Sequence, residues 1–255
     1  MDGERWFLFN ASPDLGVQIA RTRALHPKMG LRSSPIHGVV LTGGDVDVVA
    51  GLLTLRERQP LVLHATARIH GVLDANPIFD VLARDVVDRR IQALNKSFDL
   101  DEALRVELFA VPGKIPLYME QAQSAPVITA DETTVGAMIS DGRHRVFFIP
   151  GCAAMTPALA ERLEDADLVF FDATLWHDDE MIAASLGLKT GLRMGHMSLS
   201  GPQGTLAAFD AIMAGRKVAI HINNSNPILL QDTPERARLE AAGWDVAYDG
   251  MEIEL

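Results

Sequence analysis

The chain has 255 residues, of which 48% are hydrophobic and 22% are charged, the balance of a soluble globular domain and not of a disordered chain. Its 23 Lys and Arg side chains against 34 Asp and Glu give a formal net charge of −11, which argues against nucleic-acid binding through a basic face. The one cysteine, Cys152, excludes an internal disulfide framework and a cysteine-rich zinc knuckle.

The sequence lacks the features of a membrane or exported protein. No apolar run approaches the ~20 residues that span a bilayer, and the first residues, MDGERW, do not form a signal peptide. We therefore expect a cytoplasmic protein without a membrane span. No repeat or long linker marks a boundary, so we expect a single domain over residues 1–255.

Apolar runs alternate with helical patterns in the first half of the chain. Ser12 is placed to cap a helix that has Pro13 at its first position. Residues 76–98 are predicted to be mostly helical, with Asp80, Asp85 and Asp88 on solvated turns. The remaining predictions here are strands at 6–9, 38–42 and 61–65 and helices at 49–55 and 68–73.

The second half continues the same alternation. Strands are predicted at 106–111, 133–139, 145–149, 168–171 and 218–222, and helices at 156–163, 204–215 and 234–242. This order favours an α/β sandwich with helices outside two packed sheets. A simple Rossmann domain fits less well, because no G-x-G-x-x-G follows the first strand.

The first polar cluster is TGGDVDV at 42–48, directly after a predicted buried strand. The carboxylates of Asp45 and Asp47 lie two residues apart and can converge on one cation, since hard oxygen ligands suit iron, manganese, magnesium or calcium. The alternative is that Asp45 or Asp47 caps the helix that begins near Val49. The segment is not a phosphate-binding loop, because G-K-[ST] is missing.

Two further polar residues follow apolar strands. Cys152 follows the strand at 145–149 and is either a ligand or nucleophile or, as is more common, a small buried hydrophobe. Asp172 ends the wholly apolar strand at 168–171, where an unpaired carboxylate is costly. A metal or a hydrogen-bonding loop would satisfy Asp172.

Two histidines stand next to polar loops. His196, in GHMS, has room to move a proton near neutral pH, although a surface role is equally consistent with the sequence. His221 lies in an apolar strand, where a histidine is usually a satisfied core residue, but three Asn and a Pro follow it. The other histidines, among them His64, are interpreted as surface or packing residues. No Gly-x-Ser-x-Gly elbow appears, which argues against an α/β-hydrolase.

Taken together, two carboxylates after one strand, one Asp after another and two later His resemble the metal-site order of the metallo-β-lactamase fold. Several longer segments carry a closer resemblance: NASPD at 10–14, DVD at 45–47, PGCA at 150–153, KTG at 189–191, MGHMS at 194–198 and HINNSNP at 221–227. On these segments the chain resembles the coenzyme PQQ synthesis protein B family over essentially its whole length.

The resemblance implies a metallo-β-lactamase-like αββα sandwich and a role in pyrroloquinoline quinone (PQQ) biosynthesis. The implied reaction is iron-dependent hydroxylation of the tyrosine ring in a Glu–Tyr precursor, with zinc as the alternative metal. The alternative roles are a non-catalytic carrier of PQQ or its precursor towards the periplasm and a paralogue with a degenerate metal site. The implied partner is therefore the small peptide-derived precursor or PQQ.

The resemblance also implies roles for individual residues. The expected metal ligands are Asp45, Asp47, Asp172, His221 and Cys152. The expected catalytic residues are His196 and Asp47. The expected substrate-binding residues are Asn223, Asn224 and Ser198.

The chain departs from the family pattern in two places. The family's D-x-D-H loop closes with a His where this chain has Val48, and Gly43 offers no ligand at the first position. The family also normally begins earlier, with a first core strand and a Cys-rich zinc motif, so we expect the first N-terminal strand to be lacking here. An exposed neighbouring strand would invite homodimer contacts or aggregation.

Overall fold

The computed structural model describes residues 5–28, 30, 33–119 and 128–255. The chain forms two compact units, Met1–Leu108 and Phe109–Leu255. The first unit holds a four-stranded sheet, and a second, seven-stranded sheet lies mostly in the second unit. The single domain expected over residues 1–255 stays a prediction.

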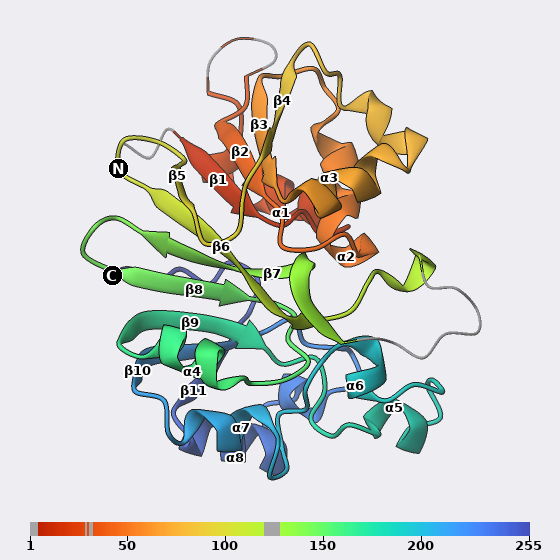
Figure 1. Cartoon of the computed structure of the whole chain (residues 1–255), viewed down its shortest axis with the longest axis vertical. Helices are drawn as coiled ribbons and strands as arrows, with labels where there is room; N and C mark the ends of the chain where they lie inside the picture. Colours follow the sequence, from red (N-terminus) through yellow and green to blue (C-terminus); the bar gives the residue numbers. More distant parts are fainter. Residues whose placement is uncertain (1–4, 29, 31–32, 120–127) are drawn as a thin grey trace. The chain divides into compact units, whose positions relative to one another are not determined.

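The first unit is built on four parallel strands in the order β1-β2-β3-β4. These strands are β1 (Trp6–Phe9), β2 (Ile36–Val40), β3 (Leu61–Ala65) and β4 (Val87–Ile91) (Figure 1). The helical segments are α1 (Leu15–Arg21), η1 (Arg23–Leu25), α2 (Val46–Val49), η2 (Ala50–Leu55), α3 (Ala67–Asp74) and η3 (Pro77–Val81). Val39 and Val40 are wholly buried, as expected of a parallel strand covered on both faces.

The helical prediction for residues 76–98 is wrong, because this stretch contains η3, β4 and β5 (Ser97–Asp99). Its charged side chains do not line one helix face but make separate ion pairs: Asp85 with Arg58, and Asp88 with Arg90. A strand that is rich in such pairs has few apolar residues to reveal its period of two.

Helix α1 begins two residues later than predicted, at Leu15. Asp14 occupies its N-cap position without a capping side-chain bond. The Ser12 hydroxyl is buried and has no hydrogen-bond partner among the described residues. The Ser12 carbonyl lies against Gly51, where an added Cβ would meet its oxygen at 2.1 Å. This close backbone approach requires glycine at position 51, in a segment that is 3-10 helix and not the predicted α-helix.

The second sheet has the strand order β11-β10-β9-β8-β7-β6-β5. Its longer strands are β6 (Arg105–Gly113), β7 (Thr129–Ser140), β8 (Arg145–Ile149), β9 (Ala166–Asp172), β10 (Ala214–Ile220) and β11 (Trp244–Val246). The helical segments are η4 (Leu117–Met119), α4 (Pro157–Leu163), α5 (Glu180–Ala183), α6 (Gly191–Met194), α7 (Thr205–Phe209), η5 (Pro227–Leu229) and α8 (Pro234–Ala241). Strands β8 to β11 are parallel neighbours, and Figure 1 shows α4, α7 and α8 beside them.

Contacts between aromatic side chains connect α7 to strands β9 and β11. The ring of Phe209 lies edge-on to Phe171 at 5.1 Å and to Trp244 at 4.9 Å between centroids. All three side chains are buried, and each such aromatic pair contributes about 0.5–1.5 kcal/mol beyond area burial. This packing fixes the carboxyl end of β9, where Asp172 pairs in register with Ile220 of β10.

The predicted boundary between the helix at 204–215 and the strand at 218–222 is also wrong. Helix α7 ends at Phe209, and β10 already begins at Ala214. A Cβ at Gly215 would lie 2.6 Å from the Asp167 carbonyl oxygen, so glycine here allows close pairing with β9. Because β10 ends at Ile220, His221 lies outside the strand.

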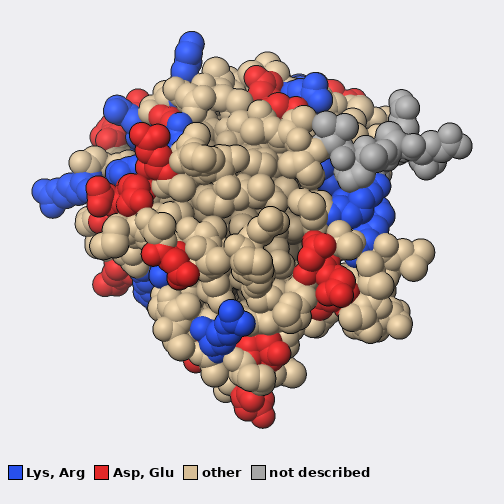
Figure 2. All heavy atoms as spheres, turned by 60° about the horizontal axis from the view of Figure 1, so that its bottom comes forward, with Lys and Arg blue, Asp and Glu red and all other residues tan. Residues whose placement is uncertain are grey.

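Among the residues that the structure describes, no helix is both long and apolar enough to cross a bilayer. Figure 2 shows acidic and basic side chains mixed around a broad area of uncharged residues. The face drawn there therefore offers no continuous cationic surface for a phosphate backbone.

The interior of the first unit contains a histidine, His64, that is 2% exposed and thus a packing residue. The Gln92 amide lies 2.9 Å from its Nδ1, and Phe98 stacks on its ring at 4.9 Å between centroids. Burial, with a smaller contribution from the Arg90 charge, lowers the pKa of His64 from 6.5 to about 4.

We expect the free energy of unfolding to fall as the pH is lowered from about 6.5 to about 4. In this window the unfolded chain protonates His64 while the folded chain does not, so added protons favour unfolding. Urea denaturation at a series of pH values measures the loss. The variant His64→Gln keeps an acceptor for Gln92 and should give a flatter profile; parallel profiles for the two proteins would contradict this assignment.

Candidate metal centre

Asp172 is the last residue of β9 and its carboxylate has no exposed surface. Oδ1 accepts hydrogen bonds from the Thr174 amide at 3.0 Å and the Thr174 hydroxyl at 2.6 Å. Oδ2 accepts from the Cys152 amide at 2.9 Å and lies 2.7 Å from His196 Nδ1. Burial raises the pKa of Asp172, but His196, His221 and the Thr174 hydroxyl outweigh it and hold the pKa below its ordinary value. The carboxylate is therefore ionised and surrounded by four polar contacts.

His196 reaches Asp172 from the loop that follows α6. The Thr190 hydroxyl caps α6 by accepting from the Arg193 amide, and Gly195 ends the helix at φ +90°, a conformation that glycine adopts without strain. The His196 amide then donates to the Gly191 carbonyl at 2.9 Å. These short-range bonds hold the imidazole, of which 18% is exposed, against the buried carboxylate.

His221 follows β10 directly and has φ +55°. A bulky side chain is rarely found in this left-handed region, and such strain gathers at functional sites. Its Nδ1 lies 2.7 Å from the Thr174 hydroxyl and 4.0 Å from Asp172 Oδ1. The side chain is 28% exposed, so His221 is not the satisfied core histidine that the alternative interpretation predicted.

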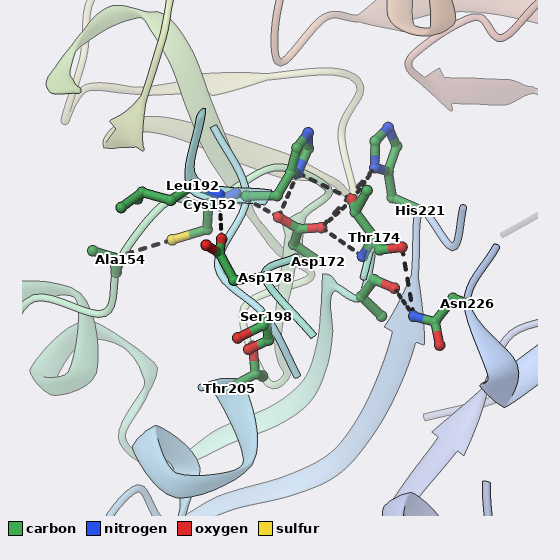
Figure 3. A network of polar contacts seen from close by, with 12 residues as sticks. Cys152, Ala154, Asp172, Thr174, Asp178, Leu192, Ser198, Thr205, His221 and Asn226 are labelled. Carbon is green, nitrogen blue, oxygen red and sulfur yellow. Dashed lines mark hydrogen bonds and ion pairs between the residues drawn. The ribbon is translucent and has the colours of Figure 1, made fainter. Parts of the chain in front are cut away.

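The two imidazoles and the carboxylate form a compact group. The rings of His196 and His221 stack with centroids 5.1 Å apart and planes 19° from parallel. One ligand atom from each of Asp172, His196 and His221 lies within 4.8 Å of the others. Figure 3 shows Asp172 and Thr174 beneath His221, whose second ring nitrogen points away from them.

Cys152 contributes its backbone amide to the centre. Its Sγ is directed to the Ala154 carbonyl oxygen at 3.3 Å, as Figure 3 shows, and lies outside the cluster of ligand atoms. Burial raises the pKa of the thiol to about 12, which opposes the thiolate form that binds metals. The role of Cys152 as a ligand stays a prediction that this geometry does not favour.

Asp45 and Asp47 belong to the first unit, whereas Asp172, His196 and His221 belong to the second. Asp45 is at the N-cap position of α2 without a capping side-chain bond, and Asp47 lies in the first helical turn. Asp45 thus occupies the cap position of the alternative interpretation without making the capping bond, Asp47 lies inside the helix, and α2 begins earlier than predicted, at Val46. Their roles as ligands, and the catalytic role of Asp47, stay predictions.

The expected substrate-binding residues lie in different surroundings. The Asn223 amide donates to the Ser225 hydroxyl at 2.6 Å and to Met181 Sδ at 3.2 Å, whereas Asn224 is exposed. The Ser198 hydroxyl donates to the Ser200 carbonyl at 3.0 Å, and Figure 3 shows Ser198 below the cluster. Asn224 is thus the most accessible of the three, and none of these roles is tested.

Sequence reasoning did not assign a role to Thr174, which contacts all three members of the cluster. The available signal was its place in the sequence Asp172-Ala173-Thr174. A hydroxyl two residues after a carboxylate at a strand end can return to bond with it, as short polar side chains do in turns.

Comparisons with known proteins agree with this fold. A family model described as a β-lactamase superfamily domain matches residues 5–222. Coenzyme PQQ synthesis protein B from Gluconacetobacter diazotrophicus is 55% identical over 99% of this chain and 84% of the relative. The protein of the same name from Xanthomonas campestris pv. campestris is 54% identical over 100% and 85%.

Solved structures give the same result for the fold. The crystal structure of Zn²⁺-bound PqqB from Methylobacterium extorquens has a TM-score of 0.96 at 52% identity and covers 100% of this chain and 85% of that one. YhfI from Bacillus subtilis, a metallo-β-lactamase fold protein, has a TM-score of 0.68 at 12% identity over 98% and 88%. The predicted metallo-β-lactamase fold is therefore confirmed.

Because the backbone at His221 is strained, two substitutions at this position should differ in stability while both lose metal binding. We expect His221→Gly to be more stable than His221→Ala by about 1 kcal/mol, because only glycine occupies the left-handed region freely. Both variants should lose zinc affinity, since both lack the imidazole. Urea denaturation and zinc titration measure the two effects. An alanine variant at least as stable as the glycine variant would show that the backbone is not strained there.

Proposed function

The chain belongs to the coenzyme PQQ synthesis protein B family of the metallo-β-lactamase superfamily, and we propose that it takes part in the synthesis of pyrroloquinoline quinone. The observation that carries the proposal is the group of Asp172, His196 and His221 at one edge of the second sheet. The relative from Methylobacterium extorquens, 52% identical, is described as Zn²⁺-bound. Family and site thus both support a metal-dependent role.

The residues present fit a transition-metal ion. Imidazole nitrogens bind both iron and zinc in proteins, and a carboxylate that holds a ligating imidazole in place commonly accompanies them. Asp172 lies against one imidazole directly and against the other through Thr174, which would hold both rings in fixed orientations. We propose iron as the working ion and zinc as the alternative.

Within this synthesis we propose that the protein hydroxylates the tyrosine ring of a Glu–Tyr precursor. Bound iron would supply the activation of dioxygen. One oxygen atom enters a ring C–H bond and the other leaves as water, so the step also takes two electrons from an external reductant and two protons. The two imidazoles support this reaction class, because non-haem Fe(II) oxygenases bind iron through two histidines together with a carboxylate.

The side chains of this centre have separate tasks in that reaction. His196 is partly exposed and would bind the ion through one ring nitrogen, while the other, Nδ1, holds its proton 2.7 Å from the Asp172 carboxylate. The exposed amide of Asn224 is available to bind the carboxyl groups of the precursor. The Asp172 carboxylate has no exposed surface, so the surrounding loops shield it from water.

Metal loading tests the centre directly. We expect anaerobic reconstitution with Fe(II) to give one iron per chain, and the loaded protein to add one oxygen atom to a Glu–Tyr dipeptide when dioxygen and a reductant are supplied. Asp172→Ala should lose the iron, whereas Asp210→Ala, an exposed residue of the same unit, should keep it. Elemental analysis and mass spectrometry give the readouts, and wild-type protein that stays free of iron would rule out the enzyme proposal.

A second candidate function is a non-catalytic carrier of the quinone or its precursor. Val48, which is 9% exposed, favours it, because this apolar residue stands where the family loop has a metal-binding His. Binding titrations with the quinone and with the Glu–Tyr dipeptide test the carrier. Tight quinone binding without iron would favour the carrier, and no measurable affinity for either compound would remove it.

Restoring the histidine tests whether the loop of Asp45 and Asp47 belongs to the metal site. We expect Val48→His to raise the affinity for Fe(II) at least tenfold by adding an imidazole ligand to two carboxylates. Val49→His makes the same chemical change one position later, at a residue that is also buried, and should only destabilise the fold. Metal titration of both variants decides the matter, and equal affinities would separate this loop from the centre.

A further inference from the structure

The Thr174 hydroxyl lies between the three members of the cluster. Its oxygen is 2.6 Å from Asp172 Oδ1, 2.7 Å from His221 Nδ1 and 3.0 Å from His196 Nδ1. The residue is 7% exposed, and its own amide also donates to Asp172 Oδ1. The backbone N–H and the hydroxyl of Thr174 thus both donate to the same carboxylate oxygen, which fixes the position of the hydroxyl.

The hydrogen-bonding capacity of a hydroxyl fixes the direction of these contacts. Thr174 has one hydroxyl proton, and it donates that proton to Asp172 Oδ1. Towards the histidines the oxygen can then only accept. The proton in the 2.7 Å contact with His221 must consequently reside on His221 Nδ1. His196 Nδ1 likewise faces an ionised acceptor, Asp172 Oδ2, and carries a proton.

The position of that proton decides which nitrogen can bind a metal. A neutral imidazole protonated on Nδ1 has its lone pair on Nε2. An ion on the Nδ1 side would need a place about 2.0–2.1 Å from each nitrogen, and the Thr174 hydroxyl already fills the space between those atoms at hydrogen-bonding distances. In Figure 3 the other ring nitrogen of His221 points away from Thr174.

We propose that Thr174 is a positioning residue that links Asp172 to His221, fixes His221 in the Nδ1–H tautomer and thereby presents Nε2 to the ion. This inference rests on the proposed function only in requiring an ion at the two histidines. It divides the cluster into a supporting side, made of Asp172 and Thr174, and a binding side, made of the two Nε2 atoms. Asp172 acts directly on His196 and through the hydroxyl on His221.

The tautomer can be read in the metal-free protein by ¹⁵N–¹H correlation spectra of labelled histidine, recorded where the imidazoles are neutral. We expect Nδ1–H for both His221 and His196 in the wild type and in Thr174→Ser, which keeps a hydroxyl. In Thr174→Val, His221 should lose this preference while His196 keeps it, because Asp172 Oδ2 remains. Nε2–H at His221 in the wild type, or an unchanged His221 in Thr174→Val, would overturn the inference.

Zinc titration of the same proteins gives a second readout that needs no turnover. We expect Thr174→Val to weaken zinc binding about 10- to 100-fold, as loss of a group supporting a ligating histidine does, and Thr174→Ser to restore it. Thr156→Val, which removes the hydroxyl that caps α4, controls for a general loss of stability. Equal weakening in the valine variants at positions 174 and 156 would mean a merely structural role.

The two proposals can fail separately. If the wild type binds zinc but no iron and hydroxylates nothing, the oxygenase fails while the tautomer result stands. If the tautomer and the zinc affinity are both indifferent to the hydroxyl, the positioning role fails while the metal centre stands.

Discussion

A carboxylate with no exposed surface constrains the whole second unit. Removing an ionised group from water costs several kcal/mol unless hydrogen bonds and a counter-charge replace the solvent. At Asp172 those partners come from three separate segments: the Cys152 amide after β8, Thr174 after β9, and His196 after α6. Each loop must therefore adopt one conformation for the charge to be tolerated. The conformation of the site therefore follows from the need to replace water around the Asp172 carboxylate with hydrogen bonds.

The backbone at His221 shows where part of that stabilisation is used. An L-residue at φ +55° is less stable than in the strand that precedes it. Extending β10 by one residue would relieve the strain, but it would turn the imidazole away from Thr174. The strained conformation persists because the 2.7 Å contact between His221 Nδ1 and the Thr174 hydroxyl holds it. The loop after His221 adds two bonds to the same segment: the backbone N–H of Asn223 donates to the Thr174 carbonyl, and the Asn226 side chain donates to the Ala173 carbonyl. The protein is thus less stable by the strain at His221, and in return the orientation of the His221 imidazole is fixed.

The sequence predicted the strands of this centre better than its bonding. An Asp at the end of an apolar strand must find partners, and this argument led to Asp172 without any structure. His221 was expected inside a strand, because a single residue in the left-handed region leaves no periodic signal. The stretch 76–98 was predicted as helix, and one of the contacts that define its actual structure, the ion pair of Asp85 with Arg58, joins positions far apart in the chain. Local pattern thus indicates the elements, while contacts of long sequence separation decide their ends.

Cys152 illustrates why residue type alone is a poor guide to role here. Attention fell on its thiol, yet the atom that serves the centre is its backbone N–H, 2.9 Å from Asp172 Oδ2. Any residue other than proline supplies that donor, so the side chain at this position is free to satisfy packing, and a small buried sulfur bonded to Ala154 does so. Two kinds of group therefore support the centre. Main-chain donors such as the Cys152 N–H cannot be recognised from residue type. The hydroxyl of Thr174 and the imidazoles of His196 and His221 can be, because few residue types supply these groups.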